Sequence, residues 1–499
     1  MTAVYTPVQR AALLLGPLLC AAAMWLIPEA VLPWAARAVL GAALWIALWW
    51  ILEPVQVEVT ALLPLVILPV SGALPIQAAA GAYGDRLVFL YLGGFVLAMA
   101  IERWGLHRRI ALAMLLLAGS DARRMVLAIM AATALISMWI SNSATALMMM
   151  PIGLSMARML AADRPAEAER LSKALVLSIA YAASIGGMAT LVGTPTNVVF
   201  SAAVRRSFGM EASFAQWMMV GTPVSVLLLL SGWFYLVRFG FPLPAARVAG
   251  SRAAIRARLR ELGPLRPEER RVLAVFILAA LAWITQGFLL KRWIPAIDDT
   301  IIALSAALLL FLLPAGEGPS RRLLDWETAV KLPWGVLLLF GGGLALAEGF
   351  SATGLAQWIG SQLSLLSGVP AWLVMLTVAV VVCYLSELAS NVATASMMMP
   401  ILASLALAID VHPYALMAVA TLAASGGFML PVATPPNAVA FGTGLLHVRE
   451  MARAGFAMNL LAIGWIVLAA LTLLPWAWGL DLRPFPEALK AAVTRLPAP

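Results

Sequence analysis

The chain has 499 residues, of which 63% are hydrophobic and 11% are charged, whereas soluble domains carry about 25% charged residues. The mean hydropathy of +0.95 indicates a polytopic membrane protein. The net charge of +9 does not indicate nucleic acid as a partner, because the basic residues fall in short loops between apolar segments, as the positive-inside rule requires. The two cysteines and three histidines lack disulfide or metal-ligand spacing, which excludes a disulfide framework and a metalloenzyme. We expect no organic cofactor.

The predicted elements begin with an apolar run at 11–27, which we interpret as a retained first helix because no clear cleavage site follows it. Residues 238–271 carry nine Arg against three Glu, so we expect them on the cytoplasmic side, lying on anionic lipid. We divide the chain into an N-terminal helix at 1–35, a first repeat at 36–240, a basic connector at 241–270, a second repeat at 271–485 and a tail at 486–499. The predicted fold is an all-α polytopic membrane protein with about eleven transmembrane helices and two re-entrant hairpins.

The division into two repeats follows from motifs that occur twice. SNSATALMMMP at 141–151 and SNVATASMMMP at 390–400 are identical at nine of eleven positions. The glycines at 93, 94 and 105 recur 249 residues later, at 342, 343 and 354, and the same separation relates the two Ser-Asn motifs. GGMATLVGTPTNVVF at 186–200 resembles GGFMLPVATPPNAVA at 426–440, 240 residues later. Self-similarity that extends over several motifs indicates a real internal repeat. Gene duplication in a structural protein is the alternative interpretation.

Two predicted hairpins, 124–158 and 371–409, hold the Ser-Asn motifs at their tips. The arms of the first hairpin, of about 14 to 16 residues, are shorter than the ~20 that span a bilayer, which favours a re-entrant hairpin. Basic residues flank both ends of the first hairpin, whereas neither end of the second carries Lys or Arg. The two hairpins are therefore expected to enter from opposite faces, as in the inverted-topology repeats of secondary transporters.

Polar residues at these tips, and at Thr-Pro motifs near 193–197 and 433–437, predict broken helices at membrane depth. Broken backbone is tolerated there only where it is buried in protein or lines a cavity. Freed carbonyls can bind a cation, and helix N-termini can bind an anion. Alternatively, such residues join membrane helices through hydrogen bonds. Residues 332–448 contain no Lys or Arg, so a bound anion would need helix dipoles or co-bound cations such as Na⁺. Glu387 is either functional or an acceptor for backbone amides.

At this point the sequence resembles the divalent anion:sodium symporter family, in which two Ser-Asn-Thr tips accompany two Thr-Pro-containing unwound helices. The resemblance implies a homodimer in which scaffold domains hold two mobile transport domains that move as elevators. It implies a first sodium site at Ser137, Ser141, Asn142 and Gly193, and a second at Ser386, Ala389, Asn391 and Ala433. It implies substrate contacts from Ser141, Asn142, Ser143, Thr194, Pro195, Ser390, Asn391, Val392, Thr434 and Pro435.

The chain departs from the family pattern at three positions. Ser143 replaces a Thr and keeps a hydroxyl, Val392 replaces a Thr and removes one, and Thr196 stands where a second Pro is usual. Because Val392 has no hydroxyl, it lacks the donor that a Thr at this position would offer to one substrate carboxylate, which places that contact in question.

We therefore predict a Na⁺-coupled anion symporter in the cytoplasmic membrane of a bacterium. The resemblance, and not the spacing of the motifs, implies that its substrates are C4 dicarboxylates (succinate, malate, fumarate) and that it works by an elevator mechanism. The alternatives within the same fold are a sodium-independent dicarboxylate exchanger and a sulfate or citrate symporter. An intramembrane enzyme would need a nucleophile with a base, a metal cluster or paired carboxylates. Because the apolar half offers no such arrangement, we expect that the protein is not an enzyme. A passive channel fits two opposed hairpins less well than alternating access does.

Overall fold

The computed structural model describes residues 5–117, 121–161, 165–243, 251–316, 322–363, 368–487 and 489–490. Part of the predicted connector (244–250) and most of the predicted tail (488 and 491–499) lie outside the described residues. Within the described ranges the regular elements are helices, with one isolated β-bridge between Pro314 and Arg322.

The first half of the chain forms α1 (Pro7–Leu26), α2 (Trp34–Leu52), α3 (Val57–Thr60), α4 (Leu63–Val70), α5 (Ile76–Tyr83), α6 (Arg86–Arg103), α7 (Leu106–Leu117), α8 (Ala122–Ser137), α9 (Asn142–Ala161), α10 (Pro165–Gly187), α11 (Pro195–Phe208), α12 (Phe214–Tyr235) and the π-helical turn η1 (Leu236–Gly240). The second half forms α13 (Ser251–Glu261), α14 (Pro267–Thr285), η2 (Gln286–Leu290), α15 (Lys291–Trp293), α16 (Asp299–Leu312), α17 (Trp326–Ala329), α18 (Trp334–Ala352), α19 (Leu355–Leu363), α20 (Ala371–Ser386), α21 (Asn391–Ala408), α22 (Pro413–Ala424), α23 (Pro435–Gly442) and α24 (Val448–Trp478).

Eight helical segments of the described part are long and apolar enough to cross a membrane, and four further apolar segments are shorter. The outgoing arms α8 and α20 have 16 residues each, but the returning arms α9 and α21 have 20 and 18. The expectation of about 14 to 16 residues for the first hairpin holds for α8 and was wrong for α9. Pro151 and Pro400 lie inside the returning helices α9 and α21 without ending them. Each helix therefore continues past the position at which the apolar pattern of the sequence weakens.

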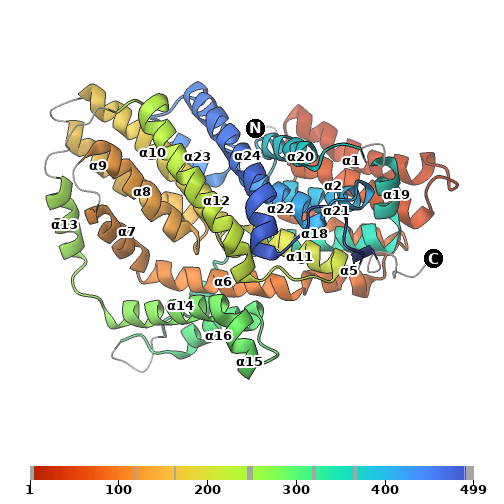
Figure 1. Cartoon of the computed structure of the whole chain (residues 1–499), viewed down its shortest axis with the longest axis horizontal. Coiled ribbons are helices and arrows are strands. Elements are labelled where there is room, and N and C mark those ends of the chain that lie inside the picture. Colours follow the sequence, from red (N-terminus) through yellow and green to blue (C-terminus); the bar gives the residue numbers. More distant parts are fainter. Residues whose placement is uncertain are drawn as a thin grey trace.

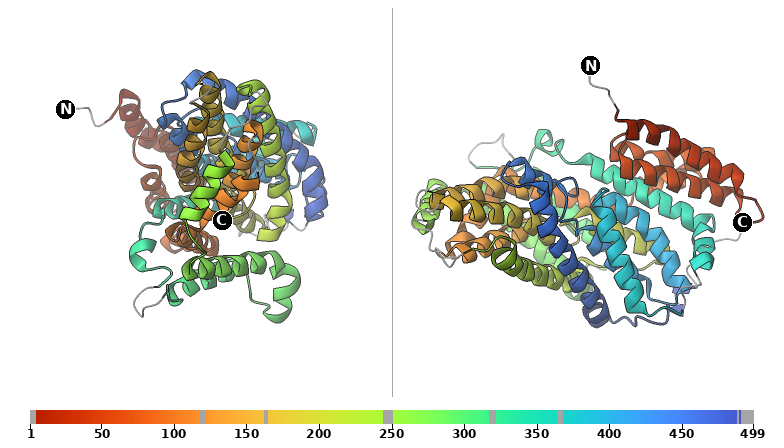
Figure 2. Two further views of the ribbon diagram at one scale, coloured as in Figure 1. Left: turned by 90° about the vertical axis from the view of Figure 1, so that its left-hand side faces the viewer. Right: turned by 90° about the horizontal axis from the view of Figure 1, so that it is seen from above.

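The helices can be divided into two groups, which pack against each other where α18 contacts α11 and α21. Figure 1 shows α8, α9 and α10 at one end of the molecule and α1 and α2 at the other. In one group α8 and α9 pack on α10, α12 packs on α24, and α20 and α21 pack on α22. In the other, α1 packs on α2, and α18 packs on α2, α4 and α5. Helix α16 packs on α6 and α14, and Figure 2 shows α14 and α16 in a separate layer along one side of the molecule.

Repeated glycines explain two close helix contacts. A Cβ on Gly93 would lie 2.7 Å from the backbone carbon of Ala303 in α16, and one on Gly342 would lie 2.5 Å from the carbonyl oxygen of Ala61. Small residues let membrane helices approach this closely. Gly105 and Gly354, which follow α6 and α18, have φ of +70° and +74°, a conformation that only glycine adopts without strain.

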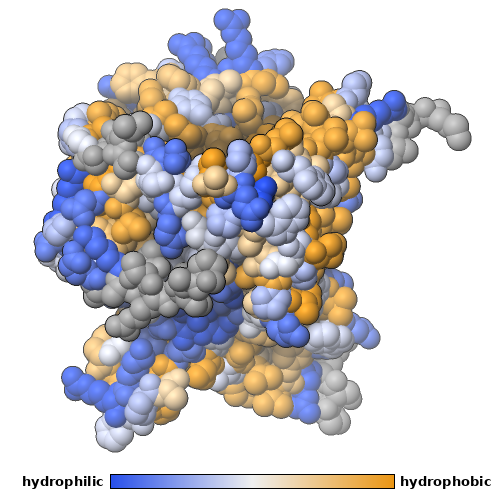
Figure 3. Space-filling model, turned by 90° about the vertical axis from the view of Figure 1, so that its right-hand side faces the viewer, coloured by the Kyte–Doolittle hydropathy of each residue, from blue (hydrophilic) through white to orange (hydrophobic). Residues whose placement is uncertain are grey.

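Large apolar side chains cover much of the outer surface of the described chain. Leu26, Trp293 and Trp476 are 79%, 82% and 78% exposed. Figure 3 shows large apolar areas on one end of the molecule, interspersed with hydrophilic residues. Exposed apolar surface on this scale is expected where lipid, and not water, is the solvent.

Candidate functional site

Each Ser-Asn motif lies at a break between two helices, and the two breaks have similar hydrogen bonds. Ser137 Oγ lies 2.7 Å from Asn142 Oδ1 and 2.6 Å from the carbonyl oxygen of Ala183. Ser386 Oγ lies 2.7 Å from Asn391 Oδ1 and 2.5 Å from the carbonyl oxygen of Ala424. Each tip is thus a cluster of hydroxyl, amide and carbonyl oxygens, which are the ligands that hard cations take in proteins.

The Thr-Pro motifs begin helices, and this differs from the prediction that they would unwind them. Pro195 and Pro435 occupy the first turns of α11 and α23, with Thr194 and Thr434 as N-caps. Proline favours this position, because the missing N–H would have no helical partner there. The unwound segments lie earlier than predicted, at 188–194 and 425–434.

A buried asparagine holds each unwound segment in place. Asn197 Nδ2 donates to the carbonyl oxygens of Gly187 and Thr190, at 3.0 and 2.7 Å. Asn437 Nδ2 donates to those of Gly427 and Leu430, at 3.2 and 3.0 Å. Both asparagine side chains are completely buried. These amides therefore order the backbone behind the tips, which packing alone would not specify.

Gly187 and Gly193 bring the first unwound segment against the first tip. A Cβ on Gly187 would lie 2.5 Å from Asn142 Oδ1, and one on Gly193 would lie 3.0 Å from the carbonyl oxygen of Met138. Any larger residue at Gly187 would displace the Asn142 side chain. The structure thus brings together Ser137, Asn142 and Gly193, three of the four residues expected at the first sodium site, and the fourth, Ser141, is at the same tip.

A cavity of about 1210 Å³ lies between the tips and the other group of helices. Its lining includes every residue expected to contact substrate: Ser141, Asn142, Ser143, Thr194, Pro195, Ser390, Asn391, Val392, Thr434 and Pro435. Gly193, Ala389 and Ala433 from the expected cation sites also line it, whereas Ser137 and Ser386 are buried behind the tips. The volume exceeds the range of about 300–1,000 Å³ for small-molecule pockets, as expected of a site with an open vestibule.

The charged side chains of the lining come from helix ends and loops and not from the tips. They are Glu53, Glu58, Glu102, Arg103 and Lys331. Arg103 is paired with Asp325 at 2.6 Å and donates to Thr328 Oγ1 at 3.0 Å. The Thr328 hydroxyl and the Arg103 guanidinium lower the pKa of Asp325 to about 2. Arg103 is therefore neutralised by its partner, and the deep part of the cavity has no cationic side chain among its described residues.

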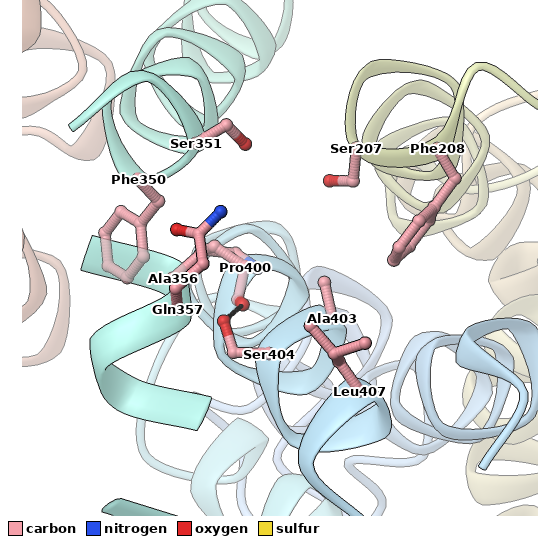
Figure 4. A pocket seen from close by; sticks show the side chains of 10 residues that line it. All are labelled: Ser207, Phe208, Phe350, Ser351, Ala356, Gln357, Pro400, Ala403, Ser404 and Leu407. Atoms are coloured by element: carbon pink, nitrogen blue, oxygen red, sulfur yellow. Dashed lines mark hydrogen bonds between the residues drawn. The ribbon is translucent and has the colours of Figure 1, made fainter. Parts of the chain in front are cut away.

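A second pocket, shown in Figure 4, lies where Ser207 and Phe208 of α11 approach Ser351 of α18 and Ser404 of α21. Its volume is about 30 Å³, and a water needs about 10–15 Å³ measured in this way. It can hold a water molecule or two but no organic anion. The large cavity is the candidate substrate site because its lining includes both Ser-Asn tips and both Thr-Pro motifs.

Glu387 is an acceptor for backbone amides, as one of the two interpretations left open by the sequence expects. Its carboxylate accepts hydrogen bonds from the backbone N–H groups of 428, 429 and 430 at 2.7, 2.9 and 3.0 Å, and from Asn459 Nδ2 at 2.8 Å. The residue is 3% exposed. It anchors the second unwound segment. In the first half the corresponding residue is Met138, whose carbonyl oxygen accepts from Thr190 Oγ1 at 2.5 Å.

Sequence reasoning missed Asn459, Thr190 and Gly187. Asn459 was detectable in principle, because it is a lone amide in the apolar helix α24 and polar residues in such helices usually have a partner. Thr190 and Gly187 lie inside the repeated segments and had no distinguishing signal.

The family model described as "Sodium:sulfate symporter transmembrane region" matches residues 9–480. The sodium-dependent dicarboxylate transporter SdcS of Staphylococcus saprophyticus is 43% identical over 491 residues, which cover 97% of this chain and 95% of that protein. SdcS of Staphylococcus aureus (strain USA300) is 43% identical over 487 residues, which cover 96% and 94% of the two chains.

Among solved structures, that of the antimetabolite efflux pump MtrF of Neisseria gonorrhoeae superposes with a TM-score of 0.55 at 13% identity, over 83% of this chain and 85% of MtrF. This likeness concerns the fold alone. The family match and the SdcS identities span nearly the whole chain. The chain therefore belongs to the sodium:sulfate symporter family, the divalent anion:sodium symporters that its motifs resemble, and it is a membrane transporter and not an enzyme.

Proposed function

We propose that the protein couples the uptake of a C4 dicarboxylate, such as succinate, malate or fumarate, to the entry of Na⁺. The observation that carries this proposal is the convergence of helix ends on the cavity. Helices α9, α11, α21 and α23 begin at Asn142, Pro195, Asn391 and Pro435, and all four of these residues line the cavity. A helix N-terminus carries about half a positive charge, so four of them present about two, which matches the charge of a dicarboxylate.

Helix C-termini meet behind the same tips. Helices α8 and α20 end at Ser137 and Ser386, whose hydroxyls reach the carbonyls of Ala183 in α10 and Ala424 in α22. Each C-terminus carries about half a negative charge, and broken transporter helices use such ends and freed carbonyls to coordinate Na⁺. We assign one Na⁺ to each tip, the first to Ser137, Ser141, Asn142 and Gly193 and the second to Ser386, Ala389, Asn391 and Ala433.

The named relatives support the choice of anion, since both are sodium-dependent dicarboxylate transporters. The family description mentions sulfate, which keeps a sulfate symporter as the second candidate. A sodium-independent exchanger would be expected to carry a basic residue in a cation site. The described residues of the two Ser-Asn tips include no Lys or Arg.

We propose that 36–240 and 271–485 are inverted-topology repeats and that the cavity opens to the cytoplasm. Arg109, shortly after the end of α6, donates to the carbonyl oxygen of Gly263 at 2.9 Å and pairs with Glu269 at 3.0 Å. The basic connector and the Arg103 end of α6 therefore share one face, which the positive-inside rule assigns to the cytoplasm. Arg103 lines the cavity, so the conformation is inward-open. An elevator movement of the group that carries the tips would then expose the cavity outside.

The remaining proposals rest on the family resemblance: a homodimer, with scaffold and transport domains in each protomer, in the cytoplasmic membrane of a bacterium.

The test is uptake of radiolabelled succinate by proteoliposomes under an inward Na⁺ gradient, with a K⁺ gradient as the control. Accumulation above equilibrium only with Na⁺ is expected, and competition by unlabelled malate and fumarate should exceed that by sulfate and citrate. Sodium-independent uptake that requires internal dicarboxylate would indicate an exchanger instead.

A further inference from the structure

One buried hydrogen bond joins the two halves of the chain close to both tips. Thr196 Oγ1 and Ser425 Oγ lie 2.8 Å apart, and the two residues are 0% and 1% exposed. Thr196 is in the first turn of α11, and Ser425 is the C-cap of α22. Neither residue lines the cavity, so neither is in a position to contact substrate.

The internal repeat provides no second copy of this bond. The offset of 240 that aligns the Thr-Pro motifs pairs Thr196 with Pro436 and Ser425 with Ile185, and neither of these side chains can form a hydrogen bond. Each half therefore has one hydroxyl where the other half has an apolar residue, and the two hydroxyls meet. The other hydrogen-bond contacts of these hydroxyls are long, 3.5 Å to Asn197 Oδ1 from Thr196 and 3.5 Å to the carbonyl oxygen of Thr421 from Ser425. The two residues therefore act mainly as a pair.

The bond connects the backbone of the two candidate cation sites. Thr196 precedes Asn197, which holds the carbonyls of Gly187 and Thr190 behind the first tip. Ser425 follows Ala424, whose carbonyl lies 2.5 Å from Ser386 Oγ at the second tip. A displacement of either unwound segment is thus transmitted to the other through two uncharged side chains.

We infer that Thr196 and Ser425 are positioning residues that couple Na⁺ binding at one tip to Na⁺ binding at the other, an inference that rests on the proposed function. When Na⁺ orders one unwound segment, the bond holds the second segment closer to its binding geometry. Such coupling is reciprocal, since each ion raises the affinity for the other by the same factor. A neutral hydrogen bond limits the effect to about fivefold, which corresponds to about 1 kcal/mol.

The experiment measures succinate uptake by proteoliposomes of the full-length protein as a function of Na⁺ concentration. It compares wild type with Thr196→Val, Ser425→Ala and the double variant. Thr133→Val is the matched control, because Thr133 is completely buried in α8 and its hydroxyl has no hydrogen-bond partner in the described structure.

Each single variant should lower the Hill coefficient towards one and raise the half-saturating Na⁺ concentration about two- to fourfold, because the fivefold coupling factor is shared between two sites. The double variant should differ little from either single variant, since one bond is lost in all three. The KM for succinate at saturating Na⁺ and the behaviour of Thr133→Val should match wild type. Thr196→Ser, which keeps the hydroxyl, should restore the Hill coefficient.

Single variants with the Hill coefficient of wild type would overturn the coupling, as would effects that add in the double variant. Should a variant fail to fold, the Na⁺-induced rise in the melting temperature of the purified Thr196→Ser and Ser425→Thr proteins gives a second readout. A rise equal to that of wild type supports the inference, and a rise lost despite the retained hydroxyl contradicts it. A wild type without any Na⁺ dependence would refute the proposed function itself, and the inference with it.

Discussion

Replacing Glu387 with glutamine tests whether one buried carboxylate holds the second unwound segment. One carboxylate oxygen accepts from the amides of 428 and 429 and from Asn459, and the other accepts from the amide of 430. In Glu387→Gln the carbonyl oxygen can keep the first three bonds. The new NH₂ group faces the amide of 430 with no acceptor between them.

The magnitude follows from these contacts. A buried donor left without an acceptor costs about 1–3 kcal/mol, and each bond that loses its charged acceptor weakens by about 1 kcal/mol. The smaller desolvation of a neutral amide offsets part of this loss. We expect Glu387→Gln to lower the free energy of unfolding by about 2–4 kcal/mol. Asn459→Leu removes the donor to Glu387 and a longer contact from the amide of 428 to Asn459 Oδ1, and we expect it to lower the free energy by about 1 kcal/mol.

The assay is unfolding of the purified protein in detergent, with Na⁺-driven uptake as the second readout. Glu327→Gln is the matched control, because Glu327 is exposed in α17 and lines no part of the cavity. Both stability and uptake should fall in Glu387→Gln and remain at the wild-type level in the control. Stability of Glu387→Gln within about 0.5 kcal/mol of wild type, the range of ordinary surface substitutions, would refute the role assigned to this carboxylate.

Three further predictions concern the tips and the orientation of the chain. Asn142→Ala and Asn391→Ala should abolish uptake while the melting temperature stays within a few degrees of wild type; uptake at normal Na⁺ affinity would remove these residues from the sites. Val392→Thr, which restores a hydroxyl to the cavity wall, should lower the KM for succinate by up to about fivefold if that hydroxyl forms one hydrogen bond, and an unchanged KM would show that position 392 does not contact substrate. In intact cells a membrane-impermeant maleimide should label Gly368→Cys and not Arg124→Cys, both of which are exposed positions. The background should be low, because the native Cys20 and Cys383 are buried. Labelling of both positions from one side would contradict the inverted topology.

The sequence predicted the positions at which helices break, because these depend on local chemistry. Ser-Asn pairs inside apolar runs, and Thr-Pro pairs, which favour an N-cap followed by the first turn of a helix, mark α9, α11, α21 and α23. The same reasoning misplaced the unwound segments. From the sequence alone a proline predicts a break in a helix. Pro195 and Pro435 instead begin helices, and the irregular backbone precedes them.

The partners of buried polar groups could not be predicted, because they come from distant parts of the chain. Glu387 binds backbone amides that lie more than 40 residues away and Asn459 in α24. Thr196 departs from the family pattern, yet its partner Ser425 lies in the other half of the chain. One-dimensional periodicity contains no information about such contacts, which depend on how the helices pack.

The most direct test of the central claim is a cryo-EM structure of the protein with Na⁺ and succinate. The claim is that helix N-termini bind the dianion while the C-terminal ends behind the same tips bind Na⁺. The predicted result is density for succinate between Asn142 and Asn391, with one ion beside Ser137 and one beside Ser386. Succinate bound instead at the mouth of the cavity, on Arg103 and Lys331, would contradict it.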